Sequence, residues 1–119
     1  MLVAGGSVSV QQNDFTLRAS GCPAGAFGLF MYGRGAARFP LGDGYLCISP
    51  FAPGLFRLAP LVSTDPSGAA DMAVDMAVLP PGGGILPGES WNFQFWFRDA
   101  LPGGSGSNLS SAVRATFEN

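Results

Sequence analysis

The most informative stretch of the sequence lies in its last third and reads Trp91-Asn92-Phe93-Gln94-Phe95-Trp96-Phe97-Arg98. Its side chains alternate with a period of two, which is the period of a β-strand. The odd positions place four aromatic rings on one face, which we expect to form one wall of the core. The even positions form a more polar second face, consisting of Asn92, Gln94, Trp96 and Arg98.

The same period continues through most of the chain, and glycine and proline separate the alternating segments. Segment 70–78 also has a helical alternative, because Ala and Met favour helices and Asp71 and Asp75 recur four residues apart. Its neighbours favour the strand. The predicted strands span residues 7–11, 14–19, 27–32, 38–40, 45–48, 56–58, 70–78, 91–98 and 109–117. The predicted turns and loops are residues 41–44, 80–84 and 101–107.

This pattern predicts an all-β protein, an antiparallel β-sandwich of jelly-roll type with about eight or nine short strands. A chain of 119 residues is expected to form a single domain, residues 1–119. We place its core within residues 7–117 and treat residues 1–6 as an N-terminal extension. Those first residues lack the features of a signal peptide, and no apolar run reaches the roughly 18 residues of a membrane span. An exported protein with this sequence would be a mature fragment or a piece of a larger product.

The composition excludes several classes of protein. Only 12% of the residues are charged, the net charge is −2, and the chain has no His and no Lys. The net charge of −2 argues against a nucleic-acid binder, which would need a basic patch. Without His there is no Ser-His-Asp relay and no His-ligated metal, and without Lys there is no GxxxxGK[ST] phosphate loop. What remains is carboxylate chemistry, a calcium site or no chemistry.

The acidic side chains offer little for catalysis. On one strand, Asp71 and Asp75 would lie about 13 Å apart, which is too far for a glycosidase pair. Asp43 and Asp99 lie in predicted turns, where Asp usually caps its own backbone. We therefore expect no enzyme activity and no cofactor, with a calcium ion at a loop Asp as the one alternative. The acidic candidates considered are Asp43, Asp65, Asp71, Asp75, Glu89 and Asp99.

Two cysteines, Cys22 and Cys47, are the only ones in the chain. In a small chain rich in glycine and proline, an even count favours one disulfide. Closing that loop of about 25 residues would add about 3.5 kcal/mol to the free energy of unfolding. The alternative is two buried free thiols. A disulfide would indicate an oxidising, extracytoplasmic location.

Trp96 marks a candidate ligand or interface surface. An exposed Trp beside Asn92, Gln94 and Arg98 is typical of a sugar-stacking platform, and Tyr32 is a candidate for the same surface. Two alternatives stay open. Trp96 belongs to the core if loops cover this face, or it lies in a contact between subunits.

The two ends of the chain predict self-association. The strands predicted at 7–11 and 113–117 lack the Lys and Pro that usually protect a sheet edge, and few charges keep copies apart. A head-to-tail contact that does not close would build a filament. We expect residues 7–12 to pair within the domain and residues 1–4 to contact a neighbouring copy. The candidate assembly residues are Leu2, Val3, Val8 and Val10.

Several segments of the sequence resemble a small C-terminal β-rich domain of exported, mostly uncharacterised proteins from planctomycetes and myxobacteria. These segments keep the order of that family and span about residues 14–117. The resemblance implies an exported, non-catalytic module and brings no catalytic residues. The segments that carry it are Ala19-Ser20-Gly21-Cys22-Pro23, Gly28-Leu29-Phe30-Met31-Tyr32-Gly33, residues 40–47, residues 91–99 and Ser107-Asn108-Leu109-Ser110.

Two functions follow from these observations. The first is an extracellular or cell-surface structural module that associates with copies of itself, into a filament or a surface layer through edge-strand contacts. The second is a carbohydrate-binding or surface-anchoring module of an exported enzyme, with polysaccharide as its partner. Neither function involves nucleic acid or a membrane span.

Overall fold

The computed structural model describes residues 1–51, 54–100 and 104–119. These residues form ten strands and one short 3-10 turn, η1 (Met76–Val78), so the all-β prediction is confirmed with slightly more strands than the sequence indicated. The strands are β1 (Leu2–Gly6), β2 (Phe15–Ala19), β3 (Phe27–Gly33), β4 (Ala36–Leu41), β5 (Gly44–Ile48), β6 (Leu55–Ser63), β7 (Ala70–Val74), β8 (Ser90–Asp99), β9 (Gly106–Leu109) and β10 (Val113–Thr116).

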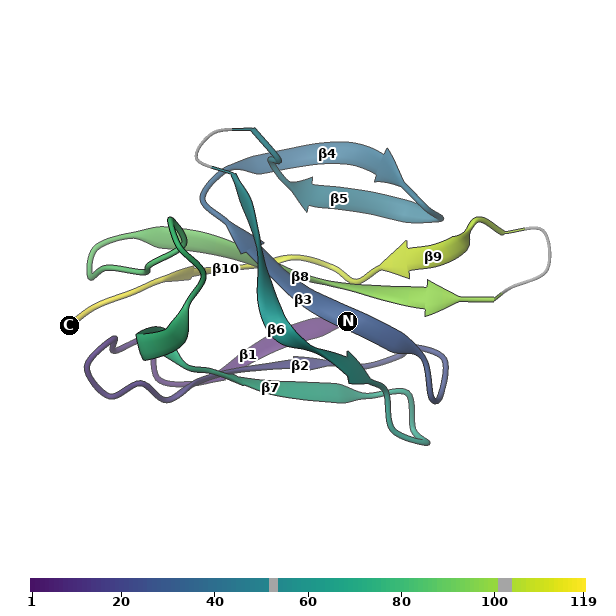
Figure 1. The fold of residues 1–119 in the computed structure, drawn as a ribbon, viewed down its shortest axis with the longest axis horizontal. Helices are drawn as coiled ribbons and strands as arrows, with labels where there is room; N and C mark the ends of the chain where they lie inside the picture. The colour runs from purple at the N-terminus through teal and green to yellow at the C-terminus, as the bar shows by residue number, and fades with distance from the viewer. Residues whose placement is uncertain (52–53, 101–103) are drawn as a thin grey trace.

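The strands are arranged in three layers, which Figure 1 shows one above the other. A three-stranded sheet with the order β1-β2-β7 forms one layer. A five-stranded sheet forms the middle layer, with the order β10-β8-β3-β6 and with β9 paired to the second half of β8. The β4–β5 hairpin forms the third layer and lies over the outer face of the middle sheet. All strand pairs are antiparallel, so the predicted sandwich is confirmed and carries an additional hairpin layer.

The main core fills the space between the three-stranded and five-stranded sheets. The odd-numbered aromatic face of β8 forms one wall, as the sequence predicted, with Phe93 and Phe95 fully buried. From the opposite sheet, the Phe15 ring lies 5.1 Å from the Phe93 ring. A Cβ on Gly28 would come within 2.3 Å of the Phe95 ring, so the packing requires glycine there. Aromatic side chains of both sheets therefore meet in the main core.

The hairpin covers a second, smaller core on the outer face of the five-stranded sheet. Its fully buried members are Met31 from β3 and Leu46 and Ile48 from β5. Both β5 residues point toward the sheet, so the residues between and beside them, Tyr45 and Cys47, point away from it. Partly buried residues extend this second core toward solvent, namely Leu29, Leu55, Trp96 and Leu109.

Two parts of the N-terminal prediction were wrong, namely that residues 1–6 form an extension outside the core and that residues 7–11 form a strand. Residues 2–6 form β1 and pair with β2, and the side chain of Leu2 is 2% exposed in the main core. Residues 7–12 form no strand and close a loop in which Ser9 bridges Glu118. The alternation at Val8 and Val10 does reflect burial, because both pack against the main core. Pairing with β2 along all five residues of β1 holds residues 2–6 in the sheet.

Several other strands begin or end at different residues from those predicted. Strand β6 continues through Pro60 to Ser63, which an edge strand tolerates because its outer backbone groups need no partner. Segment 70–78 is a strand to Val74 and then becomes η1, whose first turn Asp75 caps. Of the predicted loop 101–107, residues 101–103 lie outside the described residues, and Gly106 already begins β9. The predicted last strand, 109–117, is divided between β9 and β10.

Candidate interaction surface

The buried side chain of Gln94 attaches the hairpin to the middle sheet. Its Oε1 accepts from the Cys47 backbone N–H at 2.9 Å, and its Nε2 donates to the carbonyls of Tyr45 at 2.8 Å and Ser110 at 2.7 Å. Strand β5 contacts β8 without a backbone ladder, so the amide supplies the hydrogen bonds that a neighbouring strand would otherwise supply. Asn92 acts similarly and donates to the Arg34 carbonyl at 3.2 Å.

The tip of the hairpin is held against β9. Gly42 occupies the turn with φ of 59°, a left-handed conformation that suits glycine. The Asp43 N–H donates to the Ser107 carbonyl at 2.9 Å, and the Asp43 carboxylate accepts from the Ser105 N–H at 3.0 Å. The turn predicted at 41–44 is therefore confirmed, and it fixes the position of the hairpin over the sheet.

Most residues of the predicted ligand surface are buried and hold the fold together, so a ligand cannot reach them. Tyr32 is on the inner face and fully buried, so its assignment to a ligand surface was wrong. Asn92 and Gln94 are 7% and 0% exposed beneath the hairpin, so neither is available to a ligand. Trp96 remains half-buried, and the Arg98 guanidinium lies over its ring at 4.9 Å from the centroid. Only Trp96 and Arg98 of the predicted set reach solvent.

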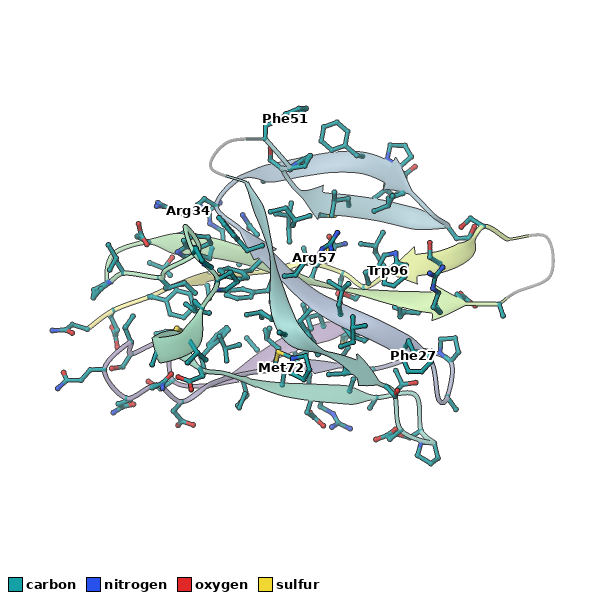
Figure 2. All side chains as sticks on the ribbon, viewed as in Figure 1. Phe27, Arg34, Phe51, Arg57, Met72 and Trp96 are labelled. Carbon is teal, nitrogen blue, oxygen red and sulfur yellow. The ribbon has the colours of Figure 1, made fainter. Side chains whose placement is uncertain are left out.

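A groove remains on the outer sheet face where the hairpin does not cover it, and we call it the hairpin groove. It contains a cavity of about 280 Å³ lined by Leu29, Met31, Leu41, Leu46, Leu55, Arg57 and Trp96. A hollow of about 310 Å³ continues it along β6 and shares Leu29 and Arg57. Two exposed apolar side chains line these hollows, Leu41 at 43% and Leu61 at 67%. Phe27, which is 64% exposed, begins β3 and lines neither hollow. Figure 2 shows Arg57 and Trp96 on this part of the molecule.

The sequence did not identify this groove, although part of its signal was present. In β3, Phe27, Leu29 and Met31 alternate on the outer face, but both faces of that strand are apolar and the pattern indicated only a central strand. Leu61 follows the predicted end of its strand and so was not assigned to any face. The pairing of Leu29 with Trp96 across β3 and β8 brings these residues together.

The predicted disulfide is absent, because Cys22 and Cys47 are both free thiols. Cys22 lies in the loop between β2 and β3 and packs against the main core. Cys47 lies in the hairpin layer and points away from the sheet. The middle sheet separates them, whereas a disulfide requires Cα atoms within about 7 Å. Burial raises the pKa of the Cys22 thiol.

The acidic candidates serve the backbone or pair with arginine. Hydrogen bonds from Ser67 and the Ala69 N–H lower the pKa of Asp65, and a bond from Asn13 lowers that of Asp75. Asp71 pairs with Arg18 at 2.7 Å. Asp99 ends β8 and is buried, not in a turn as predicted. Among the described residues, no group of three potential metal-binding side chains comes together.

A second hollow, of about 470 Å³, lies along the edges of β6 and β7. Its walls include Leu58, Met72 and Val78, so it is an open seam between the two sheets of the sandwich. The opposite seam is joined where the Leu2 N–H donates to the Ser111 hydroxyl at 3.1 Å.

Comparison with family models, with curated proteins and with solved structures finds no match for this chain. The family resemblance of the sequence therefore stays a prediction. Within the part of the chain that the structure describes, no helix is long and apolar enough to cross a membrane.

Proposed function

We propose that this domain is a non-catalytic, extracellular structural module that associates with copies of itself. The observation that carries this proposal is the hairpin groove with its exposed apolar rim. Contiguous exposed apolar surface on a small domain marks an interaction site. A chain with only 12% charged residues offers little electrostatic resistance to self-association.

The composition of the groove supports a protein partner over a polar small molecule. Arg57 is the one charged residue in its lining, and the other members are aliphatic or aromatic. A sugar would need several hydrogen-bonding groups around the aromatic ring, and the amides of Asn92 and Gln94 are already used by the hairpin. An apolar side chain fits this environment better.

The extracellular part of the proposal is supported by the family resemblance alone, since the free thiols no longer argue for an oxidising compartment. The non-catalytic part is supported by the absence of His and Lys from the sequence. It is also supported by the structural use of the carboxylates of Asp43, Asp65 and Asp75.

Sedimentation equilibrium over a wide concentration range tests self-association directly. We expect the wild-type chain to form oligomers, and the double substitution Leu41→Ser/Leu61→Ser to lower the association constant at least about tenfold, because each change removes roughly 1.5–3 kcal/mol of burial. Leu86→Ser is the matched control, since Leu86 is 62% exposed and lines neither hollow. A wild-type chain that stays monomeric at the highest concentration would contradict the proposal.

A carbohydrate-binding module is the second candidate, and one observation favours it. The half-buried Trp96 lines the groove together with Arg57, and Arg98 lies beside it. Insoluble polysaccharides would then retain the wild-type chain and release the Trp96→Ala variant. Equal retention of both chains would exclude Trp96 as a sugar platform.

A further inference from the structure

We infer that copies of this domain stack head to tail, with the hairpin groove of one copy on the outer face of the three-stranded sheet of the next. This inference rests on the proposed self-association and names the two surfaces that meet. It is carried by opposite charge on the two outer layers and by the difference in their shape.

The groove side of the molecule is basic. The hairpin and the outer face of the middle sheet carry four arginines and one acid, a sum of +3, and the ion pair between Arg34 and Glu89 at the edge of the sheet does not change this sum. Arg114 belongs to this side because it pairs with Asn92, whose amide bonds outward to the Arg34 carbonyl. In Figure 2, Arg34 and Arg57 lie on the hairpin side of the molecule. The charged residues of this side are Arg34, Arg38, Arg57, Arg98, Arg114, Asp43 and Glu89.

The opposite side of the molecule is acidic. The three-stranded sheet and the loops at its ends carry four aspartates and one arginine, a sum of −3. The remaining acids, Asp99 and Glu118, account for the rest of the net charge of −2. The charged residues of this side are Asp14, Arg18, Asp65, Asp71 and Asp75.

The acidic face is also smooth, which allows close approach. Its outward positions across the sheet form one row of Val3, Arg18 and Asp71 and another of Gly5, Thr16 and Ala73. Most of these side chains are small, and Val3 is 46% exposed. Exposed side chains that line the groove, such as Leu41 and Leu61, can rest on a flat surface of this kind.

The charge distribution selects the arrangement of the copies. Two groove sides facing each other would bring like charges together, and so would two acidic sides, whereas the groove side and the acidic side attract. A contact between two different surfaces repeats in one direction without closing, unless a rotation forms a ring. Stacking along the layer direction therefore predicts a linear filament whose formation weakens with added salt.

Paired charge reversals test this arrangement in the full chain. One variant, Arg57→Glu/Arg114→Glu, makes the groove side acidic, and the other, Asp14→Arg/Asp71→Arg, makes the sheet side basic. Thermal unfolding first verifies that both variants fold. Neither Arg57 nor Arg114 has an ion pair among the described residues, and Asp71 gives up only an exposed pair.

We expect each variant alone to lose at least about tenfold in association constant at low salt. An equimolar mixture should recover filaments in which the two variants alternate. The acidic groove side of the first variant meets the basic sheet side of the second, and the unchanged basic groove side of the second meets the unchanged acidic sheet side of the first. Light scattering and negative-stain imaging of the mixture provide the readout. A mixture that stops at one-to-one dimers, or that recovers nothing, overturns the head-to-tail arrangement. Unchanged association of the single variants also overturns it, while self-association of the wild-type chain would still stand.

Discussion

The two faces of β8 are both largely buried, but different interactions bury them. On the inner face, Phe93 and Phe95 pack against rings and aliphatic side chains from the opposite sheet. On the outer face, Gln94 is equally inaccessible, and three hydrogen bonds to backbone groups hold it there. Apolar burial needs only volume and shape, whereas a buried amide needs a partner for each polar group.

This contrast shows what a polar strand face can mean. An alternating strand usually presents its polar face to water, and here a hairpin of the same chain covers that face. The amides of Asn92 and Gln94 serve as backbone partners for the covering segment. Beyond the reach of the hairpin, the same face leaves Trp96 half-buried beside an apolar groove. The inner face of β8 thus belongs to the main core, and its outer face borders the groove that we propose as an interaction surface.

The largest effect is expected at the inner face. Phe95→Ala should lower the free energy of unfolding by about 3–5 kcal/mol, because the cavity lies among fixed side chains of two sheets. Trp96→Ala, one residue further on the outer face, should cost only about 1–2 kcal/mol, because that ring is half-exposed. Urea unfolding of both variants measures the difference. Equal losses would mean that the two faces contribute alike.

Gln94→Met tests the amide attachment of the hairpin at nearly constant volume. We expect a loss of about 2–4 kcal/mol, since the N–H of Cys47 and two carbonyls lose their partner in a buried position. Hydrogen exchange should accelerate at the Cys47 amide. The backbone amides that pair β3 with β8 should exchange only through global unfolding, so their exchange should change no more than the global stability does. If hydrogen exchange accelerated equally at the Cys47 amide and at the β3–β8 amides, the hairpin would not open separately from the sheet.

Tyr32→Phe sharpens the comparison inside the main core. The Tyr32 hydroxyl donates to the Gly83 carbonyl, and its removal should cost about 1–2 kcal/mol. Burial raises the pKa of Tyr32 to about 12. The unfolded chain releases this proton near its ordinary value of about 10, so stability is full below that pH and falls as pH rises toward 12. The variant should lack this part of the alkaline loss in thermal melts.

The smallest effect is expected for the thiols. Cys22→Ser/Cys47→Ser should change the free energy of unfolding by about 1 kcal/mol or less, because no bond joins the two layers. Thiol titration of the unfolded, unreduced wild-type chain should find two free groups. In the native chain, the raised pKa of Cys22 should slow its reaction with a thiol reagent. An intact mass two daltons below the all-thiol value would contradict this.

Sequence periodicity was sufficient for the local structure of most strands. The segments around Phe15, Phe30, Phe95 and Ala115 were placed correctly, because alternation depends on which side chains one sheet buries. The segments within residues 1–12 were misassigned because their apolar signal is short. For Leu2, burial depends on which strand completes the three-stranded sheet, and residues 1–6 do not contain that information.

The sequence by itself determined the all-β class, the aromatic wall of β8 and the exclusion of His- and Lys-dependent chemistry. These follow from residue type and nearest-neighbour spacing, which local physical chemistry can interpret. The tertiary structure alone decided that the hairpin covers Gln94, that the middle sheet separates Cys22 from Cys47, and that most arginines lie on the side opposite to most aspartates. Each of these is a relation between segments far apart in the chain, set by the way the layers stack.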